Sequence, residues 1–87
     1  MASFEIRFKK SVAKDLRGIP NKDVKRILDC IKALSTEPRL PGSEKLSAQE
    51  RYRVRQGVYR IIYEIKNNEL IVIVVKVAHR GKVYKVK

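Results

Sequence analysis

Residues Arg51–Lys66 read RYRVRQGVYRIIYEIK, and this stretch decides the fold. Tyr52–Arg55 alternates apolar and charged side chains, which is the period of a strand with one buried face. Gln56-Gly57 provides a tight turn, and Val58–Ile65 returns as a second alternating strand. The stretch therefore predicts an antiparallel hairpin, with tyrosines on one face and arginines on the other.

The rest of the chain supplies two helices and two further strands. Apolar residues recur at helical spacing after Asn21, and Leu70–Val77 is a β-branched run typical of a central strand buried on both faces. Glu37–Glu50 is read mostly as loop because it is rich in proline and glycine, and Asn67-Asn68 is read as a turn. The predicted elements outside the hairpin are a strand at Phe4–Phe8, a short helix capped by Ser11 and stopped by Gly18, a helix capped by Asn21 and ending near Ser35-Thr36, the strand Leu70–Val77, and a basic tail Ala78–Lys87.

The resulting order, β-α-α-β-β-β, indicates an α+β fold in a single domain of residues 1–87. We expect a small antiparallel sheet with the two N-terminal helices packed on one face. The first strand is expected to join the central part of the sheet and so tie the N-terminus to the core.

The formal net charge of +12 on 87 residues is the strongest compositional signal. It favours a nucleic acid, a ribosome-like particle, an anionic membrane face or an acidic protein as partner. A generally basic surface is the alternative, and it fits less well because the acidic residues are unevenly distributed. Only Glu64 and Glu69 come after the hairpin turn.

Several features indicate a cytoplasmic, reducing location. Cys30 is the single cysteine, so no intramolecular disulfide can form, and we expect it to be a core or boundary residue. The N-terminus alternates apolar residues with charge and has no signal-like apolar segment. The longest apolar run, Leu70–Val75, is too short to span a membrane.

The arginines of the hairpin define a candidate binding face. If the core lies on the tyrosine side, their guanidinium groups share the open face of the sheet. Such groups neutralise phosphates and can stabilise a pentavalent phosphorus. The cations expected on this face are Arg53, Arg55, Arg60, Lys76 and Arg80.

Chemistry on this face needs a proton-transfer group, since arginine stays protonated. His79 and Tyr84 are the two candidates, although each could also be purely structural. Metal catalysis and a nucleotide cofactor lack support, because the face has no paired carboxylates, no Cys/His cluster and no phosphate-cradling glycine loop. What remains is metal-free phosphoryl transfer, which RNA permits through its own 2′-hydroxyl.

These residues resemble the RelE/ParE superfamily of bacterial and archaeal toxins over essentially the whole chain. The most specific parts are Gly57-Val58-Tyr59-Arg60-Ile61-Ile62-Tyr63 and the ending His79-Arg80…Tyr84, supported by Lys45-Leu46 and Tyr52–Arg55. The resemblance implies a RelE-like microbial RNase fold and a toxin of a type II toxin–antitoxin pair. Such toxins enter the A site of the 70S ribosome and cleave mRNA there, without metal, by 2′-hydroxyl attack. A RelB-like antitoxin wraps the toxin and blocks it.

By position, Arg60 and Arg80 match the phosphate-binding arginines of the family, and Tyr84 matches its catalytic tyrosine. Arg53 and Arg55 fall where the RelE prototype carries lysines, and arginine supplies only charge and hydrogen bonds. The base is therefore open between Tyr84, which we favour, and His79. The expected catalytic residues are Arg60, Arg80, Tyr84 and His79, and the expected RNA-binding residues are Arg53, Arg55, Lys45 and Lys82.

Two other functions remain open. A ParE-like inhibitor of DNA gyrase shares the fold and cuts no RNA, but ParE-type members generally lack the ending with arginine and tyrosine. A plain RNA-binding module explains the charge but leaves the terminal tyrosine unexplained.

Overall fold

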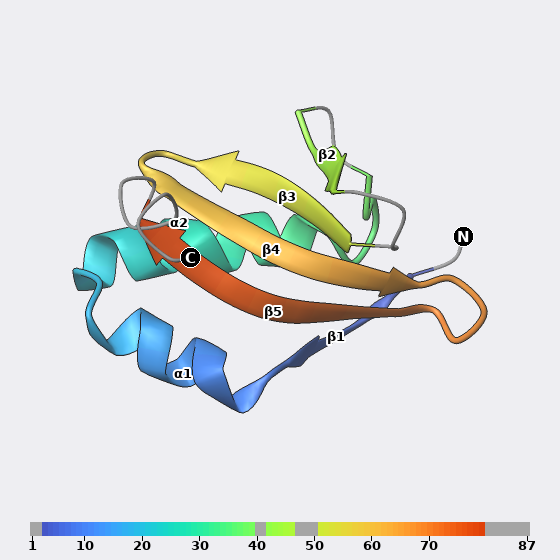
Figure 1. The fold of residues 1–87 in the computed structure, drawn as a ribbon, viewed down its shortest axis with the longest axis horizontal. Coiled ribbons are helices and arrows are strands. Elements are labelled where there is room, and N and C mark those ends of the chain that lie inside the picture. The colour runs from blue at the N-terminus through green and yellow to red at the C-terminus, as the bar shows by residue number, and fades with distance from the viewer. Residues whose placement is uncertain (1–2, 40–41, 47–50, 80–87) are drawn as a thin grey trace.

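The computed structural model describes residues 3–39, 42–46 and 51–79. Figure 1 shows the strands forming one curved sheet, with α2 crossing behind it and α1 beneath the end of β5. The elements in chain order are β1 (Glu5–Phe8), α1 (Lys10–Arg17), α2 (Asn21–Ala33), β2 (Glu44–Leu46), β3 (Arg51–Gln56), β4 (Tyr59–Lys66) and β5 (Ile71–His79).

The α+β arrangement is confirmed, and the sheet is mixed. Its strand order is β1-β5-β4-β3-β2. β1 runs parallel to β5, whereas the other neighbours are antiparallel. The expectation that the first strand joins the central part of the sheet is wrong. β4 pairs with one side of β5, so β1 pairs with the other side and forms an edge of the sheet. The two helices then lead the chain across to the opposite edge, where β2 lies.

The segment Glu37–Glu50 is not only loop, because it contains the three-residue strand β2. β2 pairs with β3 and extends the sheet at the edge opposite β1. Gly42, with φ of 93°, turns the chain just before this strand. This strand was not predicted from the sequence, because the proline and glycine residues of the segment favour a loop.

The core lies on the tyrosine face of the hairpin. Tyr63 is fully buried, stacks on Tyr52 with ring centroids 5.8 Å apart, and donates a hydrogen bond from its hydroxyl to the Pro38 carbonyl at 2.6 Å. α2 contributes Ile27, Ile31 and the following Leu34, and α1 contributes Val12. Burying this many aliphatic side chains at roughly 1.5–3 kcal/mol each is the main stabilising term for so small a chain.

The helix starts differ from the predicted caps. α1 begins at Lys10 with Lys9 as its N-cap, so Ser11 lies inside the helix. The amide of Lys9 donates to the Val74 carbonyl at 3.0 Å, which leads the chain directly from β1 into the helix. α2 begins at Asn21 and has Pro20, not Asn21, in the N-cap position.

Two tight turns connect the last three strands. Gly57 opens the β3–β4 turn with φ of 62°, a conformation open to glycine at no steric cost. In the β4–β5 turn, the positive φ falls on Leu70 (55°) and not on the predicted asparagines. The turn at Asn67-Asn68 is therefore correct in place but not in its mechanism.

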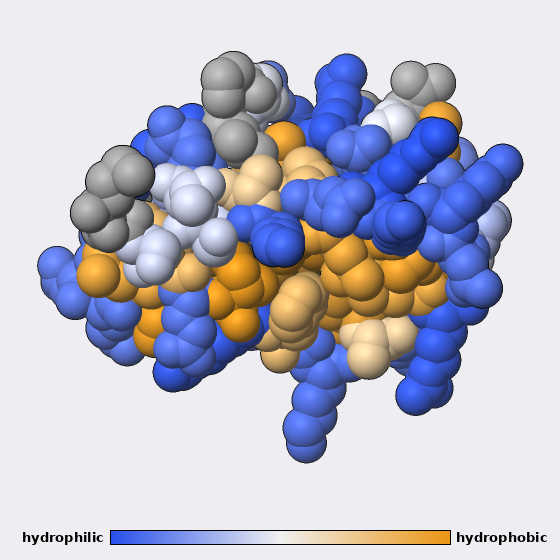
Figure 2. Space-filling view, turned by 180° about the vertical axis from the view of Figure 1, so that it is seen from behind, coloured by the Kyte–Doolittle hydropathy of each residue, from blue (hydrophilic) through white to orange (hydrophobic). Residues whose placement is uncertain are grey.

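The helical face carries apolar surface as well as charge. Figure 2 shows this face from behind the sheet, with an apolar band bordered by hydrophilic side chains. Phe8 and Leu28 are exposed and line one hollow together with Leu16 and two lysines. Cys30 is half-buried against the core, as expected, and burial raises the pKa of its thiol. Neither described helix has the length and apolar character that a membrane span requires.

Candidate functional site

The strand register gathers the hairpin arginines on the face opposite the core, as predicted. The row Val54, Ile61 and Val77 is buried, so the rows on either side of it point the other way. Directly opposite residues have Cβ atoms about 4.5–5.5 Å apart. Two rows across β3, β4 and β5 carry the cations and form what we call the arginine face: Arg55, Arg60 and Ala78 in one, and Arg53, Ile62 and Lys76 in the other.

The arginines of this face differ in accessibility. Arg55 is exposed, and the side chain of Arg53 is 24% exposed. Arg60, on the central strand β4, is only 3% exposed. The alternation alone had implied that the three guanidinium groups are equally open to solvent. The structure shows that they are not. Arg60 supports the face from within, and Arg55 meets solvent.

A carboxylate that sequence reasoning missed lies on the arginine face. Glu44 on β2 pairs with Arg53 on β3, and its Oε1 accepts a hydrogen bond from Nη2 of Arg53. This bond, together with the charges of Arg53, Arg55 and Arg60, lowers the pKa of Glu44 below its ordinary value. Glu44 therefore stays ionised at neutral pH. Glu44-Lys45-Leu46 shows no alternation of apolar and polar residues, so no local pattern marked this carboxylate.

Glu44 also borders a hollow that is open to solvent. The hollow has a volume of about 280 Å³ and is lined by Gly42, Glu44, Arg53 and Arg55. The Glu44 side chain is 62% exposed, so it can exchange Arg53 for another partner without disturbing the core. An anionic group entering here would meet two arginines and one carboxylate.

Two predicted site residues lie on the other side of the sheet. Lys45 pairs with the buried Tyr52 and so belongs to the helix side, at the β2 edge.

His79 pairs with Tyr59, and their rings meet edge-on with centroids 5.6 Å apart. Ala78, between Val77 and His79, pairs with Arg60 on the arginine face. His79 thus points away from Arg60, and the structure does not bring the two together. The predicted residues Arg80, Lys82 and Tyr84 lie outside the described residues.

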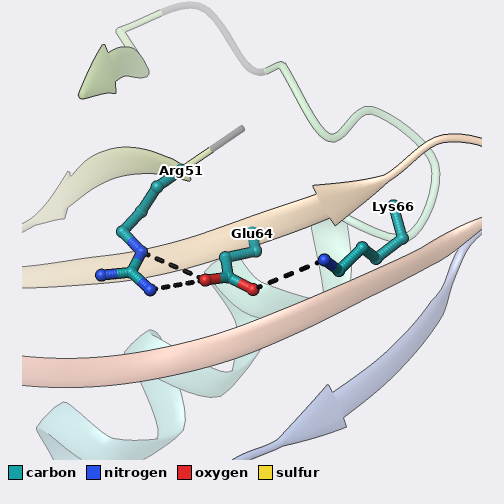
Figure 3. Close-up of polar contacts among 3 residues, drawn as sticks. All are labelled: Arg51, Glu64 and Lys66. Carbon is teal, nitrogen blue, oxygen red and sulfur yellow. Dashed lines mark hydrogen bonds and ion pairs between the residues drawn. The ribbon is translucent and has the colours of Figure 1, made fainter. Parts of the chain in front are cut away.

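A second acidic residue offsets part of the positive charge at the far end of the arginine face. Glu64 Oε2 accepts hydrogen bonds from Nη2 and Nε of Arg51 at 2.5 and 3.2 Å, and Lys66 Nζ lies 4.0 Å from Oε1 (Figure 3). The hydrogen bond from Arg51 is the main cause that lowers the pKa of Glu64. Positive charge is therefore concentrated around Arg53 and Arg55 and offset around Arg51.

We predict that Glu64→Gln makes stability less sensitive to acid. Because the folded-state pKa of Glu64 is lowered, its ion pair stabilises the fold above the ordinary glutamate pKa. That contribution is lost as pH falls through the folded value. Urea unfolding at about pH 7 and about pH 3 should show a smaller loss for Glu64→Gln than for the wild type. The control is Glu5→Gln, which removes an exposed pair with Arg7. An equal loss of stability in acid for the wild type and Glu64→Gln would show that the ion pair of Glu64 does not stabilise the fold.

No group of three or more His, Cys, Asp or Glu side chains that could hold a metal ion occurs within residues 3–39, 42–46 and 51–79. The polar chemistry of the described face rests on guanidinium groups, lysines and the carboxylates of Glu44 and Glu64.

Comparisons with known proteins agree with the fold. Residues 6–84 match the family described as ParE toxin of the type II toxin–antitoxin system parDE. The chain is 32% identical over 91 residues to RelE1 of Methanocaldococcus jannaschii, a protein named as a toxin. The match covers 94% of this chain and 96% of that relative.

Solved structures of two toxin–antitoxin complexes contain a closely similar chain. The RelBE2 complex of Mycobacterium tuberculosis gives a TM-score of 0.81 at 26% identity, covering 93% of this chain and 95% of that one. The archaeal RelE–RelB complex of Pyrococcus horikoshii gives 0.81 at 27% identity, covering 92% and 98%.

Proposed function

Because this chain belongs to the RelE/ParE family of type II toxin–antitoxin toxins, we propose that it is a RelE-type endoribonuclease. It cleaves mRNA in the ribosomal A site and thereby inhibits translation in the cytoplasm. The reaction needs no metal. The 2′-hydroxyl attacks the adjacent phosphorus, the P–O5′ bond breaks, and the products are a 2′,3′-cyclic phosphate and a 5′-hydroxyl.

The arginine face is the observation that carries this proposal. Arg55 is exposed and can donate to a non-bridging phosphate oxygen, and Arg53 lies in the next row. Arg60, held nearly without exposure, supplies a fixed positive charge beneath them. Charges fixed before the reaction stabilise the extra negative charge of the pentavalent transition state without reorganising.

Glu44 supplies the proton acceptor that arginine cannot provide. It is an ionised carboxylate on the same face as Arg53 and Arg55, and its side chain is open to solvent. The hydrogen bond from Arg53 lowers the pKa of Glu44 and so weakens it as a base. Once Arg53 turns to a phosphate oxygen, the carboxylate can accept the proton of the 2′-hydroxyl as the bond to phosphorus forms. Within this proposal, Arg80 binds phosphate, and Tyr84 stacks on the RNA or transfers a proton at the leaving oxygen. His79, on the other side of β5, supports the end of the strand.

The proposed partners are the 70S ribosome, mRNA and a RelB-like antitoxin. The net charge of +12 suits ribosomal RNA, whose phosphates would attract the toxin at long range. Two of the similar chains of known structure come from a RelBE2 complex and a RelE–RelB complex. The exposed Phe8 and Leu28 line an apolar hollow, a type of surface that commonly marks a protein interface.

A ParE-like gyrase inhibitor is the second candidate. It is favoured by one observation, namely that the family matched by residues 6–84 is described for ParE toxins. The identity to RelE1 and the carboxylate within the arginine face favour the nuclease.

Expression of the chain in a bacterial host separates the two candidates. Transcript integrity is followed by northern blotting, and plasmid supercoiling by gel electrophoresis. The nuclease proposal expects fragmented transcripts, normal supercoiling, and loss of growth arrest in Arg80→Ala and in Tyr84→Ala, which removes both the ring and the hydroxyl. Intact transcripts with impaired supercoiling would instead support the gyrase inhibitor.

A further inference from the structure

The end of β5 has an unusual side-chain partner. β1 pairs with β5 only as far as Val74, and the Lys9 amide closes this ladder on the Val74 carbonyl. A register shift near Ile62/Tyr63 then changes which residues of β5 face the outer edge. Beyond the shift, no strand of the described residues pairs with this edge, and α1 lies beside it.

Asp15 of α1 takes the place of the missing strand. Its Oδ2 accepts a hydrogen bond from the backbone amide of Val77 at 3.1 Å, a contact between residues 62 positions apart in the chain. Its Oδ1 lies 3.9 Å from Lys76 Nζ, and the side chain of Asp15 is 19% exposed. Val77 itself is 2% exposed, so its amide would be left buried and unsatisfied without this carboxylate.

We propose that Asp15 is a positioning residue that fixes the end of β5 for RNA cleavage, an inference that rests on the proposed function. Val77 is two residues before the end of the strand at His79, and Arg80 follows directly in the sequence. β4 holds this end from one side through the pair Tyr59 and His79. Asp15 holds it from the other side.

The consequence is geometric. A strand end bonded on one edge only frays readily, whereas one bonded on both edges keeps its direction. An error of about 1 Å in the placement of a phosphate-binding group can cost on the order of 100-fold in rate. Asp15 thus controls catalysis without touching RNA, and its effect should appear in the saturated rate and not in ribosome affinity.

The test compares substitutions at Asp15 with a control on the same helix. Asp15→Ala removes the acceptor, whereas Asp15→Asn keeps a carbonyl oxygen for the Val77 amide and loses the charge. Ala13→Gly, at an exposed position of α1, weakens the helix through its backbone and leaves the Asp15 carboxylate unchanged. Two readouts are needed: cleavage of ribosome-bound mRNA over a range of ribosome concentrations, and hydrogen exchange of the Val77 amide by NMR.

Asp15→Ala should lower the saturated cleavage rate by about 10–100-fold, leave the half-saturating ribosome concentration unchanged, and speed exchange at Val77. Asp15→Asn should stay near wild type in both readouts. Ala13→Gly should lose thermal stability but keep its rate. If Asp15→Ala does not fold, Asp15→Glu, which displaces the carboxylate by one methylene, should show the same rate loss in milder form.

Asp15→Ala cutting at the wild-type rate despite faster exchange at Val77 would overturn the positioning role. So would a parallel loss of rate in Ala13→Gly, since the effect would then come from helix stability. A wild-type protein that exchanges slowly at Val77 yet cuts no RNA would overturn the proposed function instead.

Discussion

Replacing Glu44 with glutamine should slow mRNA cleavage by about 10²–10⁴-fold, the contribution typical of a positioned general base. Glutamine keeps the size of the side chain and an oxygen for Arg53, but it cannot take the proton of the 2′-hydroxyl. The Glu44 side chain is 62% exposed, so stability should change little. RNA binding should not weaken, since a negative charge has been removed from a phosphate-binding face. The measurement is the single-turnover rate on programmed ribosomes.

The matched control is Glu64→Gln. Glu64 lies on the same sheet face and also pairs with an arginine, but it sits at the far end of the face beside Arg51, away from Arg53 and Arg55. This variant should cleave at the wild-type rate. A wild-type rate in Glu44→Gln would show that the proton acceptor lies elsewhere, with Tyr84 as the next residue to test.

Arg55→Ala should cost about 100-fold or more in cleavage rate, as removal of a fixed transition-state donor usually does. Arg55 is exposed, so the loss should occur without a measurable change in the free energy of unfolding. Arg55→Lys should recover only part of the rate, because lysine restores the charge without the planar pair of donors. Rate and urea unfolding are measured on the same preparations.

Lys25→Ala provides the control for net charge. Lys25 is exposed on α2 and does not belong to the arginine face. Its replacement by alanine removes one positive charge, as Arg55→Ala does. It should affect cleavage weakly and mainly at low salt. Equal losses in Arg55→Ala and Lys25→Ala would reduce Arg55 to a general contributor to the positive field.

Local alternation was enough to predict the hairpin and the direction of its arginines. Side chains in a strand alternate strictly, and the tyrosines fixed which face is buried. The facing of Arg53, Arg55 and Arg60 therefore followed from residues within a few positions of each other.

What could not be predicted depends on distant parts of the chain. β2 is three residues long in a segment rich in proline and glycine, and only its pairing with β3 makes it a strand. Glu44 comes opposite Arg53 through that pairing, which explains why the carboxylate was missed. The edge position of β1 likewise depends on a parallel contact with β5, which no local pattern encodes.

Burial and the strand irregularity decided the remaining differences. Arg60 reads in sequence like any other arginine of an open face, but it is only 3% exposed. The register shift near Ile62/Tyr63 sets which residues at the end of β5 face the core and which face the arginines. It places His79 beside Tyr59 and turns it away from the residues with which it was grouped as catalytic.

The most direct test of the central claim is primer extension on a defined mRNA in a purified translation system, with and without the protein. We predict new 5′ ends inside A-site codons, formed only when ribosomes are present, insensitive to a chelator, and formed far more slowly with Glu44→Gln. Intact mRNA in the presence of folded wild-type protein and active ribosomes would contradict the nuclease assignment.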